Sequence, residues 1–220
     1  MAPKTADDLL PILRDEQAVT DLQQYFSRSP LRYTGAYFDV LDSGGGRDDI
    51  KNVFTPADLI AVQCLSVVVP APIMLGLLEG QLGVQIGELL SQIPADVRLG
   101  DEHAKRHVAP ESYAERAWKL LRRQDDVGWV IAGKLLARKR PSLIPVWDNV
   151  VKCATGRPPN AWLWMDELLH DGRVRRELEQ LHQPASLPPL VTHLRVLDVV
   201  IWMRHRQEHR SSYCPGMTSR

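Results

Sequence analysis

The hydrophobic and polar positions along this chain follow a helical period. Apolar residues recur at three- and four-residue spacing, in runs separated by polar or proline-rich breaks. No segment alternates strictly between apolar and polar residues, as a half-buried strand does, and no internal repeat is visible. The pattern predicts an all-α protein.

Helix-end signals divide the chain into its expected elements. Thr55-Pro56 starts a helix, expected over 56–68, that is apolar nearly all round and is therefore expected to be buried. Glycines within 73–93 predict that the apolar stretch there is shortened or split. Ser112 opens a capping box, and Asp148 has the residue type of an N-cap. The other expected helices are 129–139, 148–154, 161–170, 174–182 and 190–209.

The chain, 1–220, is long enough to bury a substantial core and is interpreted as a single helical unit with two lobes. Residues 1–54 are expected to be an irregular N-terminal segment that begins with one or two short helices. Residues 55–210 form the expected helical core, with a helix-hairpin-helix at 112–140. The tail, 211–220, is expected to be disordered.

Composition narrows the class of protein. The hydrophobic fraction of 44% and the charged fraction of 25% are those of an ordinary soluble protein. No apolar run approaches the length of a membrane span, and the N-terminus lacks the apolar core of a signal peptide. A cytoplasmic protein without membrane association is therefore expected. Its 27 basic and 27 acidic residues give zero net charge, which argues against nucleic-acid binding over the whole surface.

Neither a disulfide framework nor a metal site is expected. The cysteines are odd in number and lack a CxxC spacing: Cys64, Cys153 and Cys214. His103 and His107 have the spacing of a helical metal pair, but they lie in the polar stretch 94–111 without a Glu-x-x-His pattern. His205 and His209 share that spacing and are interpreted as the end of a helix.

Positive charge gathers around the turn at Val127-Gly128. Residues 113–140 carry eight basic and three acidic side chains, a net charge of +5. Gly128 is expected to supply a positive φ, and the free amides of Val127, Gly128 and Trp129 could bind an anion. Ordinary explanations are a plain αα-turn and a solvated helical face. The cations expected to contact phosphate are Lys134, Arg138, Lys139 and Arg140.

The segment from this turn to Asp148 resembles the helix-hairpin-helix (HhH-GPD) DNA glycosylase superfamily. The matching features are the hairpin Val127-Gly128, the small Ala132, the loop 141–146 and an aspartate 20 residues after the glycine. The resemblance implies a DNA-glycosylase-like fold, with Asp148 as the catalytic carboxylate that stabilises the cationic sugar. It also implies DNA as partner, a possible monovalent cation at the hairpin and no other cofactor.

Such an enzyme must hold a base that has been flipped out of its stack, and aromatic residues help to do so. The candidates for that pocket are Trp129, Trp147, Asn149, Trp162 and Trp164. The alternative for the tryptophans is an ordinary place in the core.

Two departures from the family pattern limit the chemistry. Asp126 replaces the first hairpin glycine and brings an acid to the phosphate site, although aspartate tolerates a left-handed conformation. Val130 stands where lyase members carry their lysine, which excludes Schiff-base chemistry at that position. The cysteines do not match an iron–sulfur loop. A monofunctional, hydrolytic glycosylase is therefore favoured.

Most of the chain also resembles an uncharacterised bacterial family of unknown function. The segments that carry this resemblance are Phe54–Leu59, Leu135–Pro141, Leu143–Val146, Arg195–Val200 and Trp202–Arg204. It brings no activity with it.

Three functions remain open. The favoured one is hydrolysis of the N-glycosidic bond of a modified or damaged base in DNA; the others are non-catalytic nucleic-acid binding and catalysis on a small nucleoside-like molecule. Asp148 as a simple helix cap is the structural alternative to a catalytic role. Asp198 lies in an apolar stretch and is expected to pair structurally with Arg195, one turn earlier.

Overall fold

The computed structural model describes residues 2–209, 214 and 216. Within these residues the secondary structure is helical, and the only strand-like pairing is an isolated bridge between Arg28 and Leu31. The prediction of an all-α protein is confirmed. The expected disordered tail, 211–220, lies outside the described residues except at positions 214 and 216.

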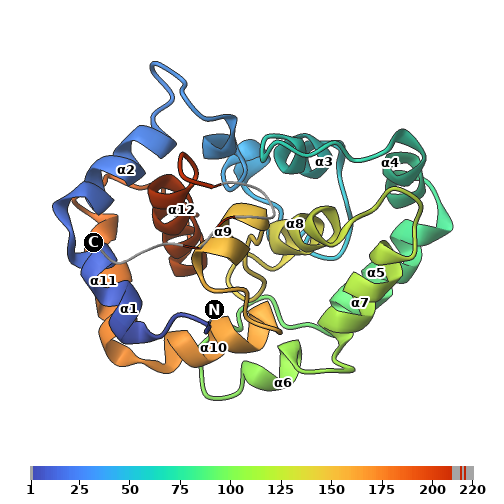
Figure 1. The fold of residues 1–220 in the computed structure, drawn as a ribbon. Helices are drawn as coiled ribbons and strands as arrows, with labels where there is room; N and C mark the ends of the chain where they lie inside the picture. The colour runs from blue at the N-terminus through green and yellow to red at the C-terminus, as the bar shows by residue number, and fades with distance from the viewer. Residues whose placement is uncertain (1, 210–213, 215, 217–220) are drawn as a thin grey trace.

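One group of helices surrounds the C-terminal helix, on the left of Figure 1. The first helix packs on α11, the second packs on α12, and α10 and α12 both contact α11. These helices are α1 (Ala6–Arg14), α2 (Glu16–Phe26), α10 (Ala161–His170), α11 (Gly172–His182) and α12 (His193–His205).

A second group lies on the right of Figure 1. Its contacts run from α4 to α5, from α5 to α7, from α7 to α8 and from α8 to α3. The helices are α3 (Pro56–Gln63), α4 (Ala71–Leu78), α5 (Gln81–Ser91), α7 (Tyr113–Arg122) and α8 (Trp129–Lys139). The short α9 (Asn149–Ala154) packs on α12, and α6 (Lys105–Val108) joins α7 to α10.

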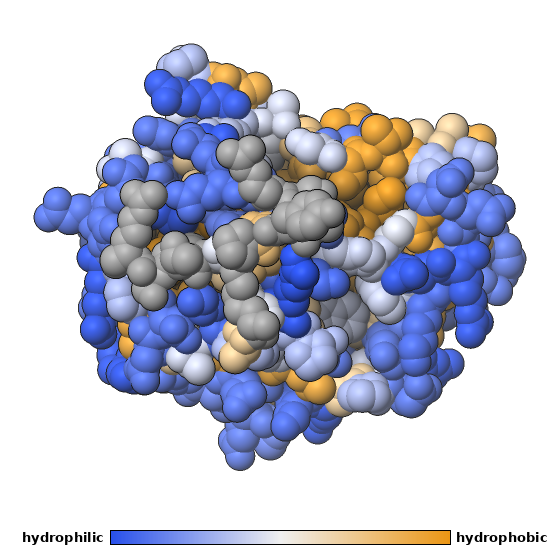
Figure 2. Space-filling model, in the orientation of Figure 1, coloured by the Kyte–Doolittle hydropathy of each residue, from blue (hydrophilic) through white to orange (hydrophobic). Residues whose placement is uncertain are grey.

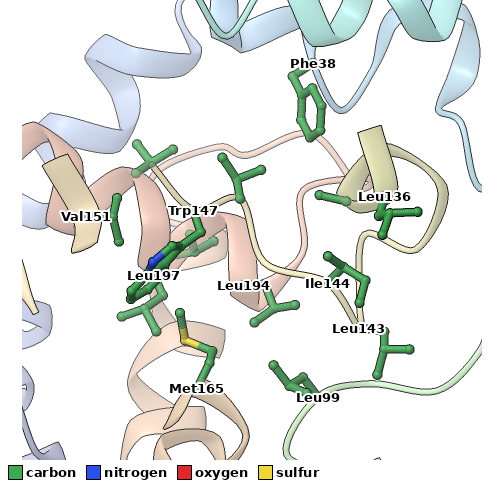
Figure 3. Close-up of a cluster of buried hydrophobic side chains, with 14 of the residues drawn as sticks. Phe38, Leu99, Leu136, Leu143, Ile144, Trp147, Val151, Met165, Leu194 and Leu197 are labelled. Atoms are coloured by element: carbon green, nitrogen blue, oxygen red, sulfur yellow. The ribbon is translucent and has the colours of Figure 1, made fainter. Parts of the chain in front are cut away.

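A continuous apolar core joins the two groups. Figure 3 shows this cluster: Trp147 and Val151 lie beside Leu197 of α12 on the left, and Leu136 of α8 and Ile144 of the following connection lie on the right, with Leu194 of α12 between the two sides. These side chains are all nearly inaccessible to water. Because burial of apolar surface is the main driving force of folding, this cluster holds the Asp148 segment between α8 and α12.

The N-terminal segment begins with short helices, as the sequence predicts. Residues 1–54 contain α1, α2 and two short 3₁₀ turns at Thr34–Tyr37 and Leu41–Ser43. Both α1 and α2 bury an apolar face against the group around α12. The expected short helices at the start of 1–54 are confirmed, and the rest of this segment contains only the two 3₁₀ turns.

Most helix ends agree with the local signals, including the predicted split within 73–93, and the end of α3 differs for a clear reason. The α4 and α5 helices are separate, because the chain leaves the helical path after Leu78 and restarts with Gly80 as the N-cap of α5. The α3 helix ends at Gln63 rather than at residue 68, because Ser66 adopts a left-handed φ of 59° that a helix cannot contain. Its Ile60 is also exposed, so α3 is buried on one side only.

Apolar side chains remain on the surface near α3 and α4. Figure 2 shows them as an orange area in the upper right, and Ile60, Val68 and Leu75 are among the exposed residues. No single helix of the described chain is long and apolar enough to cross a membrane. The α4 and α5 helices meet that test of length and composition only together, as a pair bent by 61°.

Candidate functional site

The turn between α7 and α8 differs from the expected geometry at its glycine. Asp126 takes the left-handed conformation, with φ of 60°, whereas Gly128 has φ of −73°. The expectation that Gly128 supplies the positive φ is therefore wrong, and the aspartate takes that role. Gly128 is the exposed N-cap of α8 and makes no side-chain capping bond, while Val127 is buried beneath it.

The basic run of α8 is not a surface feature. Lys134, Arg138, Lys139 and Arg140 are all buried, and each has partners within the protein. The expectation that these four residues contact phosphate from an exposed helix face is therefore wrong. Burying a cation costs free energy unless it is paired and hydrogen-bonded, so these side chains have a structural task.

Arg138 and Lys139 share one carboxylate. Asp58 of α3 accepts from Arg138 Nε at 2.8 Å and from Lys139 Nζ at 2.5 Å. Burial opposes the Asp58 charge, but the bonds from Lys139, Arg138 and the Thr55 amide outweigh it and lower the pKa of Asp58. Gly45 passes so close that a Cβ would lie 2.5 Å from Asp58 Oδ1, so the position requires glycine.

Arg140 bonds mainly to backbone oxygens. It donates to the carbonyls of Ile93 at 2.9 Å, Lys51 at 2.7 Å and Leu90 at 2.5 Å, and to Asn52 Oδ1 at 2.7 Å. Burial lowers its pKa to about 10, so the side chain remains charged near neutral pH. The basic end of α8 therefore fastens the 38–54 segment and the end of α5.

A cavity of about 620 Å³ opens beside Asp148, and we call it the Asp148 pocket. Its walls come from the 32–35 segment, from the residues just after α3, from α8, from the start of α9 and from α12. The lining side chains used below are Tyr33, Lys134, Asp148, Asn149, Asp198 and Trp202. Its volume lies in the range of roughly 300–1,000 Å³ that small-molecule sites occupy.

Asp148 is the N-cap of α9, as the sequence predicts. Its Oδ1 accepts from the amides of Val150 at 2.9 Å and Val151 at 3.0 Å. Neither bond uses Oδ2, and the side chain is only partly buried. The residue therefore caps a helix and also lines the pocket, so its structural and functional interpretations are compatible. Asn149, beside it, is exposed and lines the same pocket.

Lys134 is the member of the basic run that reaches this pocket. It lies one helical turn after Val130, and its Nζ donates to the Leu65 carbonyl at 2.9 Å. Burial lowers the pKa of Lys134, and the nearby carboxylates of Asp148 and Asp198 partly oppose that shift. The lysine therefore places a cation in the lining of the pocket, close enough to interact with both Asp148 and Asp198.

Arg195 organises the buried side of the pocket. It donates to Asp39 Oδ2 at 3.1 Å, to Tyr25 Oη at 2.6 Å and to Asp198 Oδ2. The predicted ion pair between Arg195 and Asp198 is confirmed. Burial works against the Arg195 charge, but Tyr25 and the two carboxylates outweigh it and hold its pKa above the usual value.

One guanidinium cannot neutralise two fully buried carboxylates. Burial raises the pKa of Asp39, although Arg195 opposes the shift. Burial, reinforced by the charge of Asp148, raises the pKa of Asp198 to about 7 against the same opposition. Asp198 lines the pocket, so a carboxyl that can hold a proton near neutral pH faces the same cavity as Asp148.

The predicted tryptophans do not line the Asp148 pocket. Trp129, Trp147 and Trp162 line a different cavity, of about 390 Å³, next to α7. Trp147 is nearly fully buried, with its ring centroid 5.6 Å from that of Trp164, whose Nε1 donates to the Lys4 carbonyl at 2.8 Å. The expectation that these four residues hold a base beside Asp148 is therefore wrong.

Aromatic residues other than the predicted tryptophans line the Asp148 pocket. Tyr33 and Trp202 line the Asp148 pocket with their ring centroids 5.8 Å apart, and Tyr25 stacks on Tyr33 at 5.3 Å. Trp202 could have been found from the sequence, since it follows Asp198 by four residues on a helix and so shares its face. Tyr33 carries no such signal, because it lies in an irregular segment.

The chain matches the model of a protein family. The model described as "Family of unknown function (DUF6308)" matches residues 18–205, which is most of the chain. The predicted resemblance to a family of unknown function is confirmed. No curated protein and no solved structure matches the chain.

Proposed function

The chain belongs to the family of unknown function DUF6308, and we propose that its Asp148 pocket hydrolyses the N-glycosidic bond of a nucleobase substrate. One observation carries the proposal. A carboxylate held by two backbone amides lines the same cavity as a second carboxyl with a raised pKa and two aromatic rings. A carboxyl whose environment raises its pKa to near neutral pH can act as a general acid.

The two carboxyl groups divide the reaction between them. In the proposed step the bond from the sugar C1′ to the base nitrogen breaks, and protonated Asp198 donates its proton to the departing base. The Asp148 carboxylate stabilises the positive charge that develops on the sugar and accepts a proton from the attacking water. Exchange with solvent returns Asp148 to its anionic form and Asp198 to its protonated form.

The aromatic residues supply the binding surface for the base. Tyr33 and Trp202 present rings on one side of the cavity, and flat π-faces bind nucleobases by stacking. Arg32, which also lines the pocket, adds positive charge for a ribose-linked phosphate.

A free nucleoside or nucleotide is the first candidate substrate. The cations that would have followed a DNA backbone along α8 are buried and bonded to the protein. An acid, Asp126, also occupies the α7–α8 turn. Both observations favour a substrate that fits into the pocket over a long polyanion.

A modified base in DNA is the second candidate. We propose the α7–α8 turn as the helix-hairpin-helix of this version, because the uncapped N-terminus of α8 is exposed at Gly128 near the pocket residue Val130. The base would then reach the Asp148 pocket by flipping out of the duplex.

Asp148→Asn is expected to lower the rate of base release by about 10²–10³-fold, because the neutral amide no longer stabilises the cationic sugar. Asparagine caps helices as well as aspartate does, so the free energy of unfolding should change little. The measurements are chromatography of free base released from a nucleoside and nucleotide panel, and scoring of abasic sites in modified-base duplexes.

Asp171→Asn is the matched control, since Asp171 is the N-cap of α11 and lies outside the Asp148 pocket. It should keep the wild-type rate. Free base released from the nucleoside and nucleotide panel indicates the first substrate, and abasic sites in the duplexes indicate the second. Binding of a nucleoside in calorimetry without any product identifies a non-catalytic binding protein. No Asp148-dependent product and no binding in either panel would contradict the proposal.

The pH dependence tests the role of Asp198. With its pKa raised to about 7, the carboxyl should lose its proton as the pH rises through 7, and base release should fall over that range. The folded protein holds this proton more tightly than the unfolded chain, whose aspartates titrate near about 3.9. The contribution of Asp198 to stability is therefore largest at low pH and is lost between about pH 4 and pH 7.

The titration can be read without a substrate, from the ¹³C chemical shift of the Asp198 carboxyl. A transition near pH 7 that is absent in Asp198→Asn is the expected result. A transition at the pH of an ordinary aspartate, about 3.9, would remove Asp198 as the acid of this reaction.

A further inference from the structure

Four metal-binding side chains meet where the end of α12 passes α9. They are Cys153 of α9, His205 of α12, His209 just beyond it and Cys214. Their ligand atoms all lie within 4.8 Å of one another. His205 Nε2 is 2.8 Å from Cys214 Sγ, and Cys153 Sγ donates to the Cys214 carbonyl at 3.3 Å.

The two histidines leave ring nitrogens without a partner among the residues that the structure describes. The Nδ1 atoms of His205 and His209 are buried and make no hydrogen bond within that part of the chain. Buried polar atoms are nearly always bonded, so these two require an explanation. The four-residue spacing brings both rings to one side of the chain, with their centroids 5.8 Å apart.

The donor set selects a class of metal. Two thiolates and two imidazoles are the ligands of structural zinc, whereas magnesium and calcium prefer oxygen. Bond lengths of about 2.3 Å to sulfur and about 2.0–2.1 Å to nitrogen imply ligand separations of roughly 3.3–3.8 Å in a tetrahedron. The present separations run from 2.8 Å, between His205 Nε2 and Cys214 Sγ, up to at most 4.8 Å, so side-chain shifts on the order of 1 Å reach the tetrahedral geometry.

We propose that Cys153, His205, His209 and Cys214 bind one structural Zn²⁺ ion. Four protein ligands leave no open coordination position, so the ion would stabilise the fold and would not activate water. Arg157 supports this role, because its Nη2 donates to Cys153 Sγ at 4.0 Å and such outer bonds favour the thiolate form of a metal ligand.

The zinc site would join segments that are far apart in the sequence. It connects α9, which Asp148 caps, to the end of α12 and to Cys214. His209 also lines the Asp148 pocket, so the ion would hold one wall of that cavity in place. The missing CxxC pattern hides the site from sequence inspection, because its two cysteines are 61 residues apart.

The test uses the full chain, purified with reductant, loaded with Zn²⁺ and freed of excess metal by gel filtration. One zinc per chain is expected by elemental analysis. Cys153→Ser and Cys214→Ser should each lose most of it. Cys64→Ser is the matched control, since Cys64 lies outside the cluster, and it should retain the full content.

Cobalt substitution keeps the test decisive if a serine variant fails to fold. Wild-type protein loaded with Co²⁺ should show intense visible absorption of tetrahedral cobalt and a thiolate charge-transfer band. Three outcomes would overturn the proposal: wild type without stoichiometric zinc after loading, a cobalt spectrum without thiolate features, or a Cys153–Cys214 disulfide in the mass spectrum of unreduced protein. None of these readouts depends on the activity of Asp148.

Discussion

Arg195→Met is expected to lower the free energy of unfolding by about 3–5 kcal/mol at pH 8, because it leaves two buried carboxylates without their cation. Asp39 and Asp198 both accept hydrogen bonds from Arg195, and all three side chains are nearly inaccessible to water. Methionine keeps much of the apolar volume, so the loss should come from charge and not from a cavity. Urea unfolding monitored by circular dichroism measures it.

The loss of unfolding free energy in Arg195→Met should become smaller as the pH falls. Without Arg195, the folded-state pKa values of Asp39 and Asp198 rise further, so the folded protein binds protons more tightly than the unfolded chain does. Lowering the pH from 8 to 5 should therefore recover part of the lost stability in the variant.

Arg14→Met is the matched control for this experiment. Arg14 makes an exposed ion pair with Glu177 at 2.7 Å, and surface pairs of this kind contribute about 0–1 kcal/mol. If Arg195→Met costs no more than Arg14→Met, Arg195 does not hold the two carboxylates in the way described.

Asp58→Asn is expected to cost a similar amount, about 3–5 kcal/mol, because it leaves the buried cations of Arg138 and Lys139 without their shared anion. Burial by itself would raise the pKa of Asp58, but the bonds from Lys139 and Arg138 outweigh this effect and lower the pKa in the folded protein. Its stabilising contribution is present above the unfolded value of about 3.9 and is lost as the pH falls through the folded pKa. The difference between wild type and variant should therefore narrow in acid, as urea unfolding at a series of pH values can measure.

The chain contains a close comparison for this change. Asp8 occupies the same capping-box position in α1, where its Oδ2 accepts from the Thr5 amide at 2.8 Å as Asp58 Oδ2 accepts from Thr55 at 3.0 Å. The Asp8 side chain is 38% exposed and that of Asp58 is fully buried. Asp8→Asn should cost less than about 1 kcal/mol. If both substitutions lower the free energy of unfolding equally, Asp58 stabilises the protein only through the capping box and not through the buried charge cluster.

Local interactions explain which elements can be predicted. The starts of α3 at Thr55-Pro56 and of α9 at Asp148, and the break between α4 and α5, depend on residues within one helical turn of each other. The α7–α8 turn was also predictable in position. Its backbone detail was not, since Asp126 and Gly128 can both adopt the left-handed conformation and the flanking helices select one of them.

The candidate site also contains residues that the local sequence identifies and residues that only the tertiary structure brings together. Asp148 was identified from the turn before it and from its own residue type. Asn149 was identified with it, but the aromatic residues of the pocket were not, because Tyr33 and Trp202 come from segments far from Asp148 in the sequence. The tryptophans that are near Asp148 in the sequence face a separate cavity and the core.

The amino-acid order alone established an all-helical chain, its main helix ends and a capping aspartate, since these depend on short-range spacing. Only the tertiary structure decided which partners the charged residues and the Cys/His cluster meet. Arg138 meets Asp58 across 80 residues, and Cys153 meets Cys214 across 61. A basic helix end becomes a buried anchor or a solvated surface according to which distant carboxylates and carbonyls pack against it, and no local pattern encodes that choice.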